Sequence, residues 1–326
     1  MNVAAFIVLA GVIAGYVMLD GYDLGIGTIH LFYARSEEER AASFRAIGPF
    51  WSGNEVMLIV AGAVLFALFP RAYAVSFSGF YLPFMIVLWL LMARGMSIEL
   101  RGHFQSDLWY GFWDVAFSLA SALLAIVLGV ALGNVLRGLP LDHSGYFTGT
   151  FTLLLNGYAV LVGVFTLIAL AMHGAAFAAW RIDDFVLCAK ARRAFDALWI
   201  LTIAFFVIVT WLTALVHPII RSPALWIAPV IAVAALGGSR WATAAALRFA
   251  LTSAFLFFLI ACAAQTLFPY LLPAFPIGAG GLTISNSAAG TTSITTAVVA
   301  TVIGIGAALI YATLAARRIL KGIWQG

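Results

Sequence analysis

The sequence predicts an all-α, polytopic membrane protein with about nine transmembrane helices. Of the 326 residues, 64% are hydrophobic and 9% are charged, whereas a soluble domain is typically about 45–50% apolar and about 25% charged. Long apolar stretches recur along the whole chain. The formal net charge of +4 does not indicate a nucleic-acid partner, because the position of the basic residues matters more than their sum.

Nine apolar stretches are candidate membrane helices. The first lacks a basic leader and continues past any cleavage point, so we interpret it as a retained helix and not as a signal peptide. The loop lengths are compatible with two four-helix bundles and a peripheral helix in a single membrane domain. We assign residues 1–136 to the first bundle, 150–268 to the second and 295–316 to the last helix. The nine stretches are 3–33, 47–69, 76–98, 112–136, 150–179, 197–217, 223–237, 242–268 and 295–316.

The basic residues predict the orientation of the chain. When the loops alternate between two sides, fourteen Lys and Arg residues fall on one side and three on the other, which accounts for all 17. The three are Arg71, Arg137 and Arg221. By the positive-inside rule, the N-terminus lies outside and the C-terminus lies in the cytoplasm. We assign these charges no ligand.

Three carboxylic acids in the first two stretches carry most of the functional information. Asp20 and Asp23 lie one turn apart on one helix face, and Glu55 lies near the start of the next helix. A charged carboxylate at a helix centre costs roughly 2.5–3.5 kcal/mol in lipid. We therefore expect these acids to face protein or water. The predicted orientation puts all three in the cytoplasmic leaflet, with their helices joined by a short loop at 34–46.

Neighbouring residues indicate close helix packing around these acids. Two G-x-x-x-G pairs in the first stretch favour close approach of helices, namely Gly11 with Gly15 and Gly21 with Gly25. Ser52 shares a helix face with Glu55, whereas Asn54 points elsewhere and is a candidate to cap or bridge helices. Two interpretations remain: polar groups that satisfy one another between helices, or a hydrated path for protons or ions.

The third stretch ends in charged residues. Arg94 and Glu99 are candidates for an ion pair at the cytoplasmic boundary, and we expect Glu99 and Arg101 in the headgroup layer. The segment from 268 to 293 is uncharged and contains three prolines, so we expect it to pack on other protein, such as a partner subunit. No strand is expected anywhere in the chain.

The histidines and cysteines do not indicate a metal site. The five histidines are scattered and form no H-x-x-x-H pair. His30 and His173 lie within apolar stretches, where a hydrogen bond to a neighbouring helix is a commoner role than haem ligation. Cys188 and Cys262 form no C-x-x-C motif.

Several motifs occur in a fixed order along the chain. They are Asp20-Gly21-Tyr22-Asp23-Leu24-Gly25-Ile26-Gly27, Gly48-Pro49-Phe50-Trp51-Ser52-Gly53-Asn54-Glu55-Val56, Phe66-Ala67-Leu68-Phe69-Pro70 with Tyr73, Arg94-Gly95 with Glu99-Leu100-Arg101, and Phe268-Pro269 with Leu282-Thr283-Ile284. Together they resemble subunit II of the cytochrome bd quinol oxidase family over essentially all 326 residues.

The resemblance implies a haem-free subunit of a complex that oxidises quinol, reduces dioxygen to water and takes its protons from the cytoplasm. In that family the haems, b-type and in some members d-type, belong to subunit I. Subunit II is a related nine-span scaffold that packs along subunit I and helps to form the proton inlet. We expect no metal, cofactor or catalytic residue in this chain, apart from the structural quinone or lipid that some members hold.

The resemblance also implies a location and further partners. The family is found in the cytoplasmic (inner) membrane of bacteria and archaea. Small single-helix subunits are candidate partners in addition to subunit I. Nucleic acid is not among the expected partners.

Two positions depart from the family's usual pattern. Aspartate, associated with the proton route, is usual where this chain has Ser52, and tryptophan is usual where it has Met57. Asp23 matches the family's other acidic position, so we predict that it carries most of the inlet's acid function. Asp20, Glu55 and Ser52 are predicted to assist it through water. The residues predicted to support helix packing are Trp51, Asn54, Met57, Arg94, Glu99 and Arg101.

Two other functions remain open at this point. A purely structural scaffold subunit would keep the same helices and be indifferent to the acids. A secondary transporter would also carry intramembrane carboxylates, but it would have broken helices in matching halves and would work alone.

Overall fold

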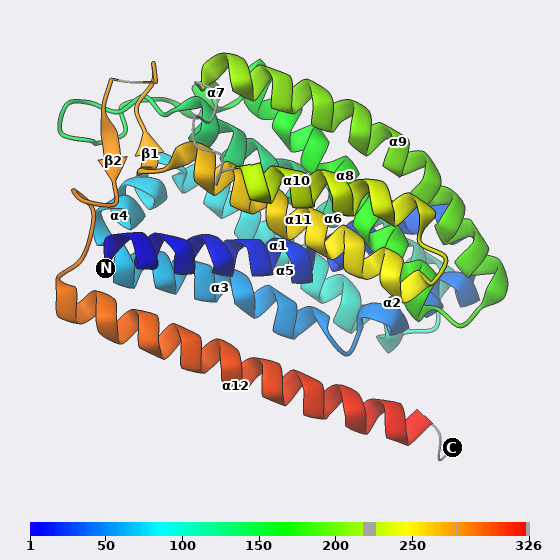
Figure 1. The fold of residues 1–326 in the computed structure, drawn as a ribbon. Coiled ribbons are helices and arrows are strands. Elements are labelled where there is room, and N and C mark those ends of the chain that lie inside the picture. The colour runs from blue at the N-terminus through cyan, green and yellow to red at the C-terminus, as the bar shows by residue number, and fades with distance from the viewer. Residues whose placement is uncertain (218–225, 278, 324–326) are drawn as a thin grey trace.

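A computed structural model describes residues 1–217, 226–277 and 279–323. Most of these residues lie in helices that run alongside one another, and a small two-stranded sheet lies at one end (Figure 1). The helices are α1 (Asn2–Tyr33), α2 (Glu37–Ile47), α3 (Trp51–Leu68), α4 (Pro70–Gly79), α5 (Tyr81–Leu100), η1 (Arg101–His103), α6 (Asp107–Arg137), α7 (Phe151–Leu154), α8 (Gly157–Arg181), α9 (Phe185–Val216), α10 (Ile227–Trp241), α11 (Ala245–Leu267) and α12 (Thr291–Ile323); the strands are β1 (Tyr270–Pro273) and β2 (Gly281–Thr283).

The predicted all-α membrane fold is confirmed. Over the described ranges, seven helices are long and apolar enough to cross a membrane, namely α1, α3, α5 extended through η1, α6, α8, α9 and α11. Helix α10 and the segment Thr291–Ala307 of α12 are apolar but shorter. Each predicted stretch therefore contains an apolar helix, but the count of nine membrane spans is not confirmed.

Helix α8 forms the centre of the molecule. Of its apolar stretch, 67% is buried within the chain, compared with 11% for α9. It packs against α6, α9, α1 and α11. The main hydrophobic core accordingly contains residues from both predicted bundles. The division of the chain into two bundles stays a prediction.

Glycines allow α1 and α8 to approach closely. A Cβ on Gly25 would collide with the carbonyl oxygen of Leu170, and one on Gly174 would collide with the backbone at Gly25. The close approach predicted at Gly25 is therefore confirmed. At Gly11 no atom of a described residue lies within 4 Å of such a Cβ, so close approach there stays a prediction.

The predicted loop at 34–46 is largely a helix, α2. Ser36 caps it through a reciprocal pair of hydrogen bonds: the Glu39 amide donates to the Ser36 hydroxyl at 3.3 Å, and the Ser36 amide donates to the Glu39 carboxylate at 3.3 Å. The S-x-x-E spacing is a helix-start signature that was visible in the sequence. The predicted connection between the first two stretches is present, and most of it is helical.

The expectation of no strand was also wrong. Strands β1 and β2 pair antiparallel within the uncharged segment that precedes α12. Leu272, Leu282 and Ile284 from this segment are buried in a second hydrophobic cluster with residues of α1, α3 and α4. The segment therefore packs on protein as expected, but here the covering protein is its own chain.

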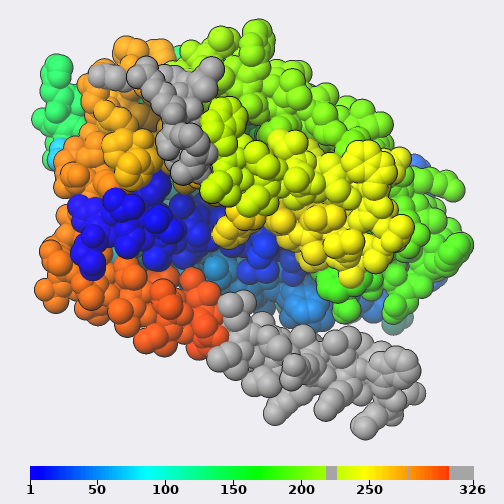
Figure 2. Space-filling view, in the orientation of Figure 1, coloured from blue at the N-terminus to red at the C-terminus, as the bar shows by residue number. Residues whose placement is uncertain are grey.

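Helix α12 lies at the edge of the molecule. It packs against α3 and, less extensively, against α1. The space-filling view shows the N-terminal part of α1, in blue, at the surface between the orange start of α12 and the yellow helices α10 and α11 (Figure 2). Many large apolar side chains on the outer helices are exposed, as expected of surfaces that contact lipid or another membrane chain.

Candidate functional site

Arg94 on α5 connects acidic side chains from two other helices. Its guanidinium makes two hydrogen bonds to Asp20 on α1, from Nη2 to Oδ1 at 2.6 Å and from Nη1 to Oδ2 at 3.2 Å. It also lies 3.7 Å from Asp23 Oδ2 and 3.8 Å from Glu55 Oε2 on α3. We call these four residues the acid cluster. The predicted pairing of Arg94 with Glu99 is wrong, because five residues place them about 140° apart around a helix.

Asn54 fixes one side of Asp23. Its side-chain nitrogen donates to Asp23 Oδ2 at 2.8 Å and to the Tyr22 hydroxyl at 2.6 Å. Asn54 therefore bridges α3 and α1, which is the bridging role expected from the sequence. The Tyr22 ring stacks on Phe177 of α8, with 4.0 Å between ring centroids, so this contact also anchors the cluster to the central helix.

The acid cluster is buried except at Glu55. Asp20, Asp23 and Arg94 have 0% exposed side chains, whereas that of Glu55 is 24% exposed. Among the described residues, no hydrogen-bond partner is found for four buried atoms, namely Asp23 Oδ1, Glu55 Oε2, Arg94 Nε and the Tyr16 hydroxyl. Buried polar atoms are normally satisfied by protein or by ordered water. The cluster therefore offers positions where water can connect its carboxylates.

The charges of the acid cluster do not balance. Three carboxylates share one guanidinium, so the fully ionised cluster carries a net charge of −2. Burial of unbalanced charge is costly in the low-dielectric interior. Asp20 occupies the guanidinium with two hydrogen bonds. Asp23 and Glu55 are consequently the two acids whose charge a bound proton can neutralise.

The other residues predicted around the inlet do not join this cluster. Ser52 and Glu99 are exposed on the surface of the chain. The Trp51 ring packs beside Gly95 of α5, and the methyl group of Met57 packs beside Gly15 of α1. Trp51 and Met57 thus make helix contacts.

A second buried network surrounds Asp114 of α6. Its Oδ1 atom accepts from Arg101 Nε at 2.6 Å and lies 3.1 Å from His30 Nε2, while Oδ2 accepts from Arg40 Nη1 at 3.2 Å. Arg101 also donates to Glu37 at 2.7 Å. These five residues, the Asp114 network, join α1, α2, η1 and α6. Arg101 was predicted in the headgroup layer, and its depth in the membrane stays a prediction; its guanidinium binds the buried Asp114 carboxylate.

The sequence reasoning missed Asp114, although a signal was present. Asp114 lies inside the apolar stretch 112–136, and this was the signal that identified Asp20 and Asp23. A carboxylate in such a stretch predicts a buried cation as its partner. The partners come from distant parts of the chain, so the sequence alone did not reveal them.

The two intramembrane histidines are used differently. His173 uses both ring nitrogens, with Nδ1 2.8 Å from the Thr252 hydroxyl and Nε2 3.0 Å from the Met18 carbonyl oxygen. His30 uses Nε2 toward Asp114, whereas its buried Nδ1 has no hydrogen-bond partner among the described residues, and its ring packs edge-on against Phe44 and Phe117. Among the described residues, no group of three or more His, Cys, Asp or Glu side chains could hold a metal ion.

Comparison with known proteins identifies the family. Residues 1–318 match the family model of cytochrome bd terminal oxidase subunit II. The chain belongs to this subunit II family. Among its relatives is cytochrome bd-I ubiquinol oxidase subunit 2 of Escherichia coli K12, which is 37% identical over 174 residues, covering 52% of this chain and 46% of the relative.

Two further bacterial members of the subunit II family align with the chain. Cytochrome bd ubiquinol oxidase subunit 2 of Bacillus subtilis is 37% identical over 172 residues, covering 53% of this chain and 51% of the relative. A probable cytochrome oxidase subunit 2 of Haemophilus influenzae is 31% identical over 296 residues, covering 79% of this chain and 78% of the relative. The matches to the E. coli and B. subtilis proteins thus span about half of their lengths.

A solved structure supports the fold of this subunit II family member. A chain of the bd oxidase from Geobacillus thermodenitrificans superimposes with a TM-score of 0.78, and the match covers 98% of both chains. The sequence identity is 19%, so this likeness bears on the fold alone.

Proposed function

We propose that this chain is the haem-free subunit II of a bd-type respiratory oxidase, which oxidises quinol and reduces dioxygen to water. In this proposal it packs along a haem-bearing subunit I and lines an inlet for protons from the cytoplasm. Family membership and the names of two relatives, both ubiquinol oxidase subunits, support the assignment to a quinol oxidase. The acid cluster supports the role of a proton inlet.

The observation that carries this proposal is the sharing of one guanidinium by three carboxylates in a buried site. A site built only for stability would balance its buried charges, because unpaired charge is costly in the interior. A site that takes up protons needs carboxylates whose negative charge is not balanced by a cation. Since Asp20 pairs with Arg94, Asp23 and Glu55 are proposed to hold the proton in transit.

The geometry suggests an order for proton transfer. Glu55 is the member of the cluster whose side chain reaches the surface, so it takes the proton first. Asn54, which also donates to the Tyr22 hydroxyl, holds one side of Asp23, while Asp23 Oδ1 has no hydrogen-bond partner among the described residues and can receive the proton through water. The exposed Ser52 lies one turn before Glu55 and is proposed to order water at the entrance.

The proposal places the redox chemistry on the partner subunit. The resemblance to the family and its subunit II membership support this placement, and His173, whose two ring nitrogens both have hydrogen-bond partners, is not proposed as a haem ligand. The orientation with the N-terminus outside and the C-terminus in the cytoplasm is part of the proposal, and it rests on the distribution of basic residues. It brings the partly exposed Glu55 to the cytoplasmic half of a bacterial or archaeal membrane.

The first test is purification of the complex through a tag on this chain. A haem-bearing partner and quinol-driven oxygen uptake are expected. Asp23→Asn should slow turnover several-fold while the haem spectrum and the subunit ratio stay unchanged. The matched control is Asp196→Asn, the same chemical change at an exposed residue of α9.

The outcomes separate the alternative functions. Wild-type turnover in an assembled Asp23→Asn complex would support a scaffold without a proton role. Recovery of the chain without any haem-bearing partner would contradict the oxidase assignment and favour a transporter.

A further inference from the structure

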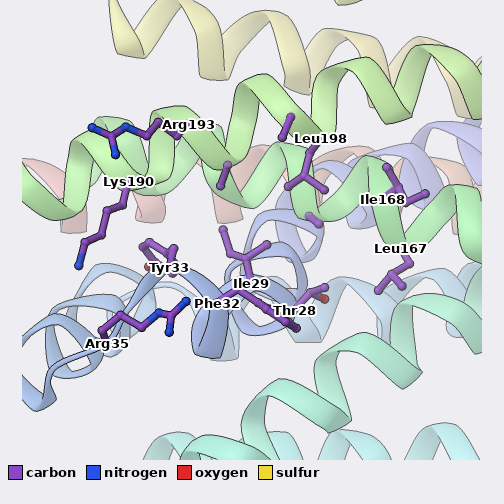
Figure 3. Close-up of a pocket in the computed structure, with 13 residues that line it drawn as sticks. Thr28, Ile29, Phe32, Tyr33, Arg35, Leu167, Ile168, Lys190, Arg193 and Leu198 are labelled. Atoms are coloured by element: carbon purple, nitrogen blue, oxygen red, sulfur yellow. The ribbon is translucent and has the colours of Figure 1, made fainter.

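A groove between α1, α8 and α9 lies outside both ion networks. Its volume is about 590 Å³, within the usual range of ligand sites. Aliphatic side chains line most of it, including those of Ile29, Leu167 and Leu198. Arg35, Lys190 and Arg193 gather at one end, and Leu167 and Ile168 lie at the other end (Figure 3).

From this arrangement we propose that the groove binds an anionic phospholipid, with its phosphate at Arg35 and Arg193 and one acyl chain along the apolar part. The proposal goes beyond the oxidase function and does not depend on it. It requires only that the chain lies in a membrane with the basic end of the groove at headgroup level.

The dimensions fit a lipid chain that lies along the helices. From Lys190 to Leu198 is eight residues of α9, and the groove follows α1 from Thr28 to its end at Tyr33, with Arg35 two residues beyond. At 1.5 Å per residue the groove extends roughly 10–12 Å from its basic end, which is most of the ~15 Å half-thickness of the hydrocarbon core. Phe32 and Ala197 at its border are exposed, so a lipid can enter from the side.

The charges at the basic end are complementary to a lipid phosphate. Lys190 is paired with Glu39, 2.5 Å from Nζ to Oε1. Neither Arg35 nor Arg193 forms an ion pair with a described residue, and both are exposed. The three basic groups and Glu39 together carry a net charge of +2. Basic pockets between membrane helices on the cytoplasmic side are the sites where anionic lipid headgroups bind.

Glu39 holds the basic end in a fixed shape. Its Oε2 atom accepts from the backbone amides of Arg35 at 2.6 Å and Ser36 at 3.3 Å, while Oε1 accepts from Lys190. Burial raises the pKa of the Glu39 carboxyl, but Lys190 and the two amides lower it more, so the net shift of the pKa is downward. Glu39 therefore stays ionised at neutral pH and ties the end of α1 to α9.

The test is native mass spectrometry of the complex purified through the full-length chain and titrated with single lipids. The probes are dioleoyl phosphatidylglycerol, cardiolipin and zwitterionic phosphatidylethanolamine. Arg35→Gln/Arg193→Gln should bind the two anionic lipids weaker by a factor on the order of ten or more, because each basic side chain at an anionic headgroup contributes appreciably. The control is Arg45→Gln/Arg192→Gln, which removes the same charge at exposed residues outside the groove.

A second variant tests the acyl-chain part with all charges kept. Ala197→Phe fills the side of the groove and should lower binding of the anionic lipids several-fold. Binding equal to wild type in either the Arg35/Arg193 variant or Ala197→Phe would overturn the proposal. So would equal affinity for phosphatidylethanolamine, or displacement of the lipid by millimolar inorganic phosphate, which would indicate a simple anion site.

Discussion

The acid cluster and the Asp114 network use the same kinds of residue but balance them differently. Both include side chains of α1, and Asp23 and His30 lie seven residues apart on nearly the same face, roughly 10 Å along the helix. In the acid cluster, three carboxylates share one guanidinium. In the Asp114 network, two carboxylates meet two guanidiniums and a histidine. The first has surplus acid, and the second does not.

The hydrogen bonds of the two buried aspartates, Asp114 and Asp23, show the same difference. Both oxygens of Asp114 have hydrogen-bond partners, so its positions for a proton are occupied. Within the described part of the chain, one oxygen of Asp23 has no hydrogen-bond partner, and neither has Arg94 Nε. Satisfied networks make a structure rigid, whereas incomplete ones are where water and function are found. The comparison supports our proposal that the acid cluster holds a proton, and it indicates that Asp114 acts as a clamp between helices.

The largest effect is expected for Arg94→Gln. It removes the guanidinium and leaves three buried carboxylates, which should cost about 3–5 kcal/mol of stability at alkaline pH. Proton uptake by the buried carboxylates removes the repulsion between their charges, so the folded variant binds more protons than the unfolded chain. The stability of the variant should therefore rise as the pH is lowered. Thermal unfolding of the purified complex between pH 6 and 8.5 measures this. A loss independent of pH would contradict the surplus of acid.

Asp114→Asn is expected to lower the stability somewhat less, and it leaves unpaired cations where Arg94→Gln leaves unpaired carboxylates. It leaves Arg101 and Arg40 without their shared anion, at a cost of about 3 kcal/mol, the lower end for a broken buried pair because Arg40 is partly exposed. Arginine does not give up its proton, so lowering the pH should bring no recovery. The same pH series compares the two variants directly. Recovery at low pH would show that the two networks are not distinct.

Asn54→Ala sharpens the comparison within the acid cluster. It deletes two hydrogen bonds, one of them to a carboxylate, and should cost about 1.5–3 kcal/mol. If Asp23 is the proton site, the turnover of the assembled complex should fall as well, because the carboxyl is no longer held in place. Unchanged turnover in a destabilised complex would limit Asn54 to packing.

Glu37→Gln should have the smallest effect. Glu37 lies at the outer end of the Asp114 network with a 44% exposed side chain, and surface ion pairs contribute about 0–1 kcal/mol. A change in melting temperature of a few degrees at most is expected, and turnover should match wild type. A large loss would mean that the clamp depends on its outer charge and not on Asp114.

Much of the framework followed from composition and local pattern. The extent of the apolar stretches predicted where the helices lie, and the high cost of charge in lipid predicted that Asp20 and Asp23 point inward. The G-x-x-x-G spacing of Gly21 and Gly25 indicated a close helix crossing, because this pattern lies within one helix and can be read from the sequence. The sequence also contains the S-x-x-E pattern at Ser36 and Glu39, which indicates the start of α2.

The tertiary structure alone decided which charges meet. Arg94 lies 74 residues from Asp20, and His30 lies 84 residues from Asp114. Spacing within a helix shows which side chains share a face, but it does not show which other helix that face meets. The sequence by itself determined a membrane protein with inward-facing acids. Only the packing of α1 against α3, α6 and α8, together with Arg94 reaching α1 from α5, decided that one set of acids shares a single cation while the other meets two.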